Sequence, residues 1–107
     1  MIKFLASLFF LLIASTSYAS RNKEPLEYFD ISQLQVKSVE IKDNLNIAYV
    51  ESQDNVVYPV KVGNYLGRNN GLVFEISSTF VKVREMVRSK NGHGWKERDL
   101  TLKVKAD

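Results

Sequence analysis

"VKVGNYLGRNNGLVFEIS" (residues 60–77) contains three of the chain's five glycines and joins two runs in which apolar and polar residues alternate. Alternation with a period of two is typical of half-buried β-strands. A phosphate-binding glycine motif stands between a strand and a helix, whereas Gly71 is followed by LVFEIS, which is expected to be a strand. The spacing of Gly63, Gly67 and Gly71 also fits neither the dinucleotide fingerprint nor the P-loop. We therefore expect the glycines to shape a tight connection between two strands.

The same alternation recurs on both sides of this connection. Polar turn sequences, KDNLN, SQDN, SST and SKNGHG, separate the alternating runs. A single open sheet would leave one apolar face in water, so short strands of this kind must close into a barrel or stack as two sheets. The sequence therefore predicts an all-β domain, a small β-sandwich or partly open barrel of about six to seven antiparallel strands. The apolar positions that fit the period are Leu34, Val36, Val39, Ile41, Ala48, Val50, Val56, Tyr58, Val60, Val62, Leu72, Phe74, Ile76, Val81, Val83, Leu100, Leu102 and Val104.

The first predicted strand contains an irregularity. Its apolar parity changes between Val36 and Val39, which predicts a bulge or a swap of faces near Ser38. Just before it, residues 27–34 (EYFDISQL) could form one short turn of helix. No other stretch after the N-terminal segment shows a helical period, so the domain is expected to consist of strands and turns.

Two large or charged side chains near the C-terminus are expected to be buried. Glu85 has the parity of Val81 and Val83 and should face inward, where a carboxylate needs a partner such as Arg98 or a tyrosine hydroxyl. We interpret such a pair as structural rather than as a general base. Trp95 is expected to be partly buried against the NYLG connection, because its apolar area is costly to expose.

Composition argues against several classes of function. The 107 residues, 45% of them hydrophobic and 25% charged, suit one small domain. The formal charge of +3 is spread along the chain, so nucleic-acid binding is not expected. The absence of cysteine excludes disulfides, Cys-ligated zinc and thiol nucleophiles, and His93, between two glycines, has no second histidine to form a metal site. We expect neither enzyme activity nor a cofactor. A convergent pair of His93 and a carboxylate would favour a small hydrolase, and an enclosed apolar pocket would favour a module that binds a small ligand or polysaccharide.

The N-terminus has the pattern of a secretory signal peptide. Residues 1–20 (MIKFLASLFFLLIASTSYAS) place a lysine before an apolar run of residues 4–14 and end in small residues that suit signal peptidase. We expect a signal peptide over residues 1–19 cleaved after Ala19, a flexible lead-in over residues 20–27 and the β domain over residues 28–105. An uncleaved anchor is the alternative. No cysteine follows the apolar run, so lipidation is not expected, and the predicted location is the periplasm.

The sequence also resembles a known family. The run VKVGNYLGRNNGLVFEIS, followed by VKVREMV, a glycine-containing loop and GWKERDLTLKV, is similar to the periplasmic domain of the PilP family of type IV pilus assembly proteins. The similarity extends over residues 25–104, including the lead-in PLEYFDISQLQV. It implies a β-sandwich, similar also to the homology region of the type II secretion protein GspC, in which Tyr65 and Leu66 pack in the core. The motif residues are Gly63, Tyr65, Leu66, Gly67, Asn69, Gly71, Glu85, Gly94, Trp95, Glu97 and Arg98.

The function that this resemblance implies is binding. Domains of this kind connect an inner-membrane assembly platform to the outer-membrane secretin, so the expected partners are the secretin's N-terminal periplasmic domains and PilN/PilO-like inner-membrane proteins. A competence pilus for DNA uptake could use such a member. In the GspC relatives the first strand contributes to secretin contact, which places the expected interface here on residues 34–42. The expected partner-binding residues are Val36, Lys37, Val39, Ile41, Lys42, Arg84 and Arg88.

Overall fold

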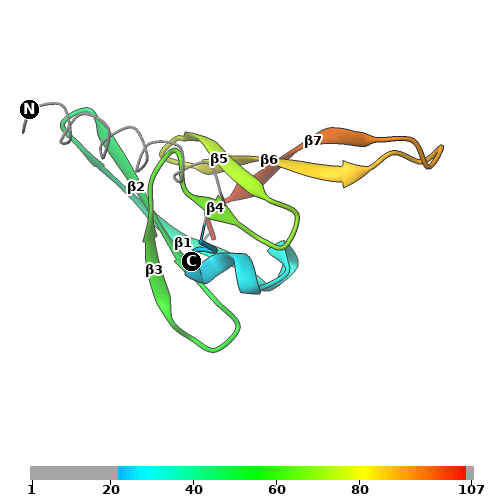
Figure 1. Ribbon diagram of the computed structural model, residues 1–107. Helices are drawn as coiled ribbons and strands as arrows, with labels where there is room; N and C mark the ends of the chain where they lie inside the picture. The colour runs from blue at the N-terminus through cyan, green and yellow to red at the C-terminus, as the bar shows by residue number, and fades with distance from the viewer. Residues whose placement is uncertain (1–21, 106–107) are drawn as a thin grey trace, which may run out of the picture.

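A computed structural model describes residues 22–105 as two antiparallel β-sheets that share one core (Figure 1). The first sheet has the order β1-β2-β3 and the second the order β4-β5-β6-β7. The predicted all-β sandwich is confirmed, and the predicted signal peptide lies outside the described residues. The elements are η1 (Pro25–Tyr28), η2 (Ile31–Gln33), β1 (Gln35–Lys42), β2 (Leu45–Glu51), β3 (Val57–Val60), β4 (Tyr65–Leu66), β5 (Gly71–Ile76), β6 (Phe80–Arg88) and β7 (Trp95–Lys103).

Apolar side chains from both sheets fill the space between them. The period-two alternation of the strands supplies one inward row from each, and β-branched valine dominates these rows, as suits a pleated surface. Tyr58, Leu102 and other half-buried side chains pack around the rim. The buried apolar residues are Leu26, Leu34, Val36, Ala48, Val50, Val60, Leu66, Val73, Ile76, Val81 and Val83.

The irregularity predicted in the first strand is a β-bulge. Val36 pairs with Val50 and Val39 pairs with Ala48, and the register shifts between Val36 and Ser38, so that Lys37 is the extra residue. Because Val50 and Ala48 lie two residues apart on one face of β2, the bulge keeps Val36 and Val39 on the same inward face. The faces are therefore not swapped.

A second bulge, in β5, was not predicted. The register shifts between Val73 and Glu75, which leaves Phe74 as the extra residue. Val73 and Ile76 are the buried residues of this strand beside Gly71, whereas Leu72 and Phe74 are only partly buried. The expected inward row of Leu72, Phe74 and Ile76 is therefore wrong at its first two positions.

Three other apolar residues expected to face the core are exposed. Val56 and Val62 flank β3 without belonging to it, and they are 41% and 58% exposed. Ile41 faces inward in register but lies near the end of the β1–β2 hairpin, and it is 59% exposed. At the N-terminal side the domain begins earlier than residue 28: Leu26 is 3% exposed and its carbonyl accepts a 3.0 Å hydrogen bond from the Gly67 N–H.

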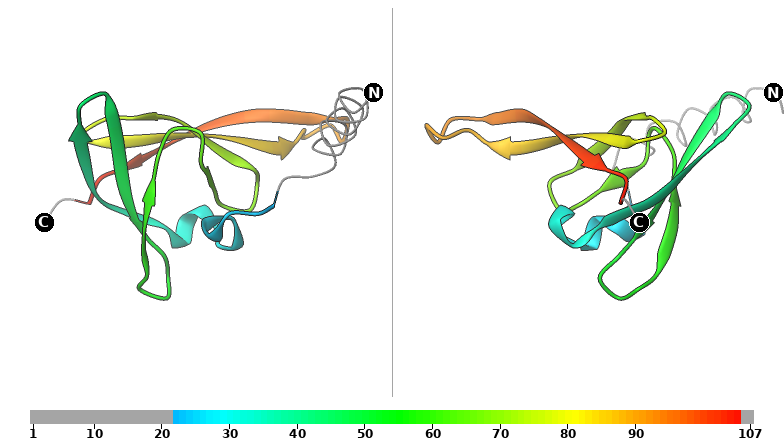
Figure 2. Two further views of the ribbon diagram at one scale, coloured as in Figure 1. Left: turned by 60° about the vertical axis from the view of Figure 1, so that its left-hand side comes forward. Right: turned by 180° about the vertical axis from the view of Figure 1, so that it is seen from behind.

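The expected burial of Trp95 is also wrong. Trp95 is 63% exposed and pairs with Arg88 at the far end of the β6–β7 hairpin. Figures 1 and 2 show this hairpin reaching well beyond the sandwich, away from the NYLG connection. No helix in the described part of the chain is long and apolar enough to cross a bilayer.

Candidate protein-binding surfaces

Glu85 and the glycine-rich connection form one structural unit. The Glu85 side chain is fully buried, and its Oε1 accepts a 2.7 Å hydrogen bond from Arg98, the residue directly opposite on β7. The Asn69 side-chain amide lies 3.4 Å from Oε2, and the Asn69 carbonyl accepts a hydrogen bond from the Met86 N–H. The predicted inward position and the Arg98 partner are thus observed, and the arrangement anchors the turn at residues 67–70 to β6.

Two glycines let the connection approach its neighbours. Gly67 has a φ of +78°, and a Cβ placed there would lie 3.3 Å from Ile31 Cβ. A Cβ on Gly71 would meet Val83 Cγ1 at 2.7 Å and would collide with the Leu66 carbonyl. Leu66 is fully buried and Tyr65 partly so, as their expected core packing requires. These motif residues therefore shape the fold rather than hold a ligand.

The outer edge of β1 is open along most of its length. At its start, the Val36 carbonyl accepts a 2.9 Å hydrogen bond from the Lys105 N–H, but residues 38–42 form no backbone hydrogen bond on that edge within residues 22–105. Ile41 and Lys42 are exposed there, while Val36 is buried and Val39 half-buried. Lys37, in the bulge, lies 3.6 Å from the Glu51 carboxylate.

The two arginines expected at the same interface lie elsewhere. Arg84 sits on the outer face of β6, where its Nε donates a 2.8 Å hydrogen bond to Asp99 and its guanidinium lies 4.4 Å from the Phe74 ring centroid. The hydrogen bond to Arg84 lowers the pKa of Asp99 below its ordinary value and raises that of Arg84. Arg88 lies four residues further along β6, which belongs to the four-stranded sheet, whereas β1 belongs to the three-stranded sheet. The structure therefore brings together the β1 residues and not Arg84 and Arg88.

The remaining motif residues gather on the outer part of the β6–β7 hairpin. Gly94 has a φ of +72° in the connecting loop, and Glu97 lies 3.7 Å from Arg84 Nε. Arg88 stacks over the Trp95 ring at 5.1 Å. Sequence reasoning missed this pair, although the six residues between two alternating runs predict a hairpin that places residues 88 and 95 opposite each other.

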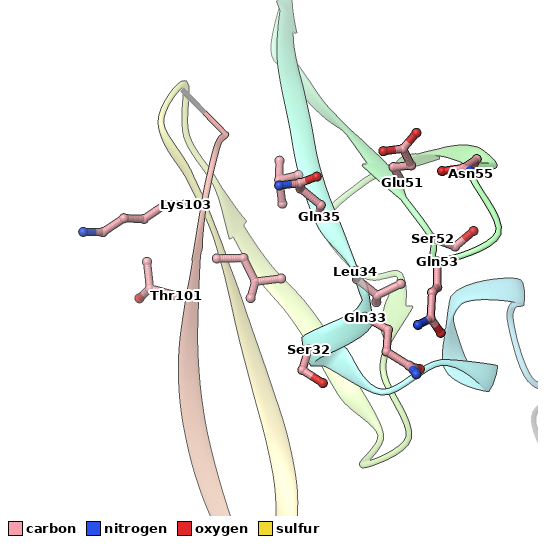
Figure 3. A pocket seen from close by; sticks show the side chains of 12 residues that line it. Ser32, Gln33, Leu34, Gln35, Glu51, Ser52, Gln53, Asn55, Thr101 and Lys103 are labelled. Atoms are coloured by element: carbon pink, nitrogen blue, oxygen red, sulfur yellow. The ribbon is translucent and has the colours of Figure 1, made fainter. Parts of the chain in front are cut away.

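The groove and His93 bear on the two alternative functions. A groove of about 640 Å³ lies between the start of β1, the end of β2 and the end of β7 (Figure 3). It is open, and amides, hydroxyls and charged groups such as Gln35, Thr101 and Lys103 line it, unlike an enclosed apolar pocket. His93 is exposed in the β6–β7 loop, and no described group of three His, Cys, Asp or Glu residues could hold a metal ion.

The domain is a small β-sandwich in which the buried carboxylate has a structural role. Its accessible features are an open strand edge and a protruding hairpin. The chain belongs to the PilP family, because the family model described as "Pilus assembly protein, PilP" matches residues 14–104. The predicted resemblance is confirmed.

Relatives and solved structures agree with this assignment. The type IV pilus inner membrane component PilP of Pseudomonas aeruginosa is 35% identical over 86 residues, which are 80% of this chain and 48% of the relative. The chain thus spans about half the length of that curated relative. A solved domain of the P. aeruginosa type IV pilus biogenesis lipoprotein PilP is 34% identical, with a TM-score of 0.69 over 79% of this chain and 95% of that one. The domain of the Neisseria meningitidis PilP pilot protein is 28% identical, with a TM-score of 0.62 over 80% of this chain and 74% of that one.

Proposed function

We propose that the chain is a periplasmic adaptor of a type IV pilus or related DNA-uptake machine, and that it links the inner-membrane assembly platform to the outer-membrane secretin by binding proteins. Membership of the PilP family and the signal-like N-terminus support this role. The relative in P. aeruginosa is described as an inner membrane component, which is consistent with a platform on that side. The role requires no catalysis and no cofactor.

The secretin's N-terminal domains are the proposed partner of β1. The observation that carries this proposal is the open outer edge of β1 at residues 38–42. Unpaired amides and carbonyls on a sheet edge can pair with a strand of another protein, which gives main-chain affinity. The exposed Ile41 would supply apolar contact, and Lys42 would steer the encounter with an acidic surface.

Titration of the domain with purified secretin N-terminal domains tests the proposal. Lys42→Glu should slow association about tenfold at low salt, since charge steers encounter, with little change in dissociation or thermal stability. Lys37→Glu should act in the same direction but would also lose the Glu51 pair, so Lys42 is the cleaner site. Lys61→Glu, on the exposed loop after β3, is the matched control and should bind as the parent does.

The charge-reversed variant Lys42→Glu can also contradict the proposal. Equal affinity and equal salt dependence for Lys42→Glu and the parent would show that β1 is not the interface. Absence of any binding by the parent chain at high micromolar concentration would remove the secretin as its partner.

A further inference from the structure

The outer half of the β6–β7 hairpin, residues 86–97, projects from the sandwich and is here called the distal arm. Every residue from position 90 to position 99 is exposed. Figure 2 shows from two sides that the arm leaves the body of the domain as a two-stranded ribbon. Glu85 and Arg98 lie just before its base, and no core residue of the sandwich lies within the arm.

The outer face of the arm has the composition of a binding surface. Trp95 pairs with Arg88 across the ribbon, and Met86, paired with Glu97, continues the same face. The Arg88 guanidinium lies 5.1 Å from the indole centroid, a cation–π contact, while 63% of Trp95 is open to solvent. Tryptophan, methionine and arginine are among the residues enriched in protein interfaces, and tryptophan, with only two side-chain torsions, loses little entropy on binding.

The arm also carries positive charge without compensation. Arg88, Lys90 and Lys96 form no ion pair with another residue in the described chain. No aspartate or glutamate occurs between Met86 and Lys96 in the sequence, and the first one after them, Glu97, lies beside Arg84. The potential around the tip is therefore positive, and it favours an acidic partner.

These observations point to a protein rather than to a nucleic acid or a membrane. Nearer the sandwich, Asp99 and Glu97 accompany Arg84 on the outer face, so the basic residues do not continue along the hairpin into a track for a phosphate backbone. A single tryptophan buries too little apolar area for stable attachment to a bilayer, which takes two anchoring signals. Its size instead suits one pocket in a partner, with the cations contacting the rim.

We propose that the distal arm is a second docking surface, which inserts Trp95 into a cleft rimmed by carboxylates on a protein partner. This inference rests on the proposed function in one respect, that an adaptor binds two partners. The β1–β2 hairpin and the arm lie at opposite ends of the molecule, so one partner at each end would not compete for space (Figures 1 and 2).

Site-specific photo-crosslinking in the native host tests the arm directly. The full chain carries p-benzoylphenylalanine in place of Trp95, and in separate strains in place of Ile41 or of Val62, a residue 58% exposed outside the strands. Position 95 should give one protein adduct that position 62 does not give, and mass spectrometry should map it to an acidic segment. Adding Arg88→Glu and Lys90→Glu to the position 95 strain should reduce the adduct about tenfold, because both changes repel carboxylates.

Other outcomes overturn the inference. Adducts at position 95 to lipid alone, no adduct beyond that of position 62, or an adduct unaffected by the charge reversals would each show that the arm is not such a surface. An adduct to the secretin at position 41 without one at position 95 would leave the proposed function standing and remove the arm; the reverse result would do the opposite. The same two charge reversals in the parent chain should leave the temperature of unfolding unchanged, since both side chains are exposed and outside the core, so a lost adduct is not a lost fold.

Discussion

Glu85 is the residue on which the second sheet and the glycine-rich connection both depend. Among residues 22–105, Glu85 is fully buried and Glu27 is the other buried charged residue, at 3% exposed. The partner of Glu85, Arg98, has a side chain that is 51% exposed. Water reaches the guanidinium, so the arginine can bind without full loss of hydration, while the carboxylate exchanges water for two protein donors. The position of Glu85 could be predicted because two valines of the same parity precede it.

Removal of the arginine should therefore destabilise the domain. Arg98→Ala leaves a buried carboxylate with only the long Asn69 contact, and we expect the free energy of unfolding to fall by about 2 kcal/mol. Lys96→Ala, two residues away on β7 and without an ion pair in the described chain, is the control and should change it by less than about 0.5 kcal/mol. Urea denaturation of both variants measures the difference. Equal stability of the two would show that Glu85 is satisfied without Arg98.

At the scale of elements, the connection between β3 and β5 is ordered by close approach rather than by ligand. Gly71 faces Leu66 in the β4–β5 register and lies against Val83 of β6. Gly63 differs, because its φ is +100° but nothing lies within 4 Å of a Cβ placed there. The two glycines therefore serve the fold for different physical reasons, packing in one case and backbone conformation in the other.

The two alanine substitutions should separate these reasons. Gly71→Ala forces its Cβ against the Leu66 backbone and Val83, which cannot both move, and should cost about 3 kcal/mol. Gly63→Ala places alanine at positive φ in open space and should cost about 1 kcal/mol. Thermal unfolding of the two variants gives the order. A smaller loss of stability for Gly71→Ala than for Gly63→Ala would show that the connection can accommodate a Cβ at position 71.

The register of a strand can be predicted where polar residues alternate clearly with apolar ones. In β1 the polar residues between Val36 and Val39 reveal the bulge, whereas in β5 the consecutive apolar residues 71–74 leave the parity ambiguous, so its bulge was missed. Trp95 was misplaced for another reason. Alternation gives the face of a residue on its strand, but not whether the opposing sheet extends far enough to cover it. The β6–β7 hairpin extends beyond the three-stranded sheet (Figure 1).

The whole molecule separates its two exposed features. The open edge of β1 belongs to the three-stranded sheet, and the distal arm belongs to the four-stranded sheet and points the other way (Figures 1 and 2). Between them, η1 contacts the β4–β5 connection, where the Leu26 carbonyl accepts a hydrogen bond from the Gly67 N–H. Sites this far apart, with no shared contacts, are expected to bind independently.

Independence of the two ends gives the last prediction. In titrations with secretin N-terminal domains, Trp95→Ala should leave the affinity within about twofold of the parent, because distant sites perturb one another by only a few tenths of a kcal/mol. The double variant Lys42→Glu/Trp95→Ala should then bind the secretin as Lys42→Glu alone does. Parallel measurement of thermal unfolding should give the parent value for all three, since both side chains are exposed. A loss of secretin affinity on Trp95→Ala comparable to that of Lys42→Glu would instead place the arm within the secretin interface, and the domain would have one extended binding surface rather than two.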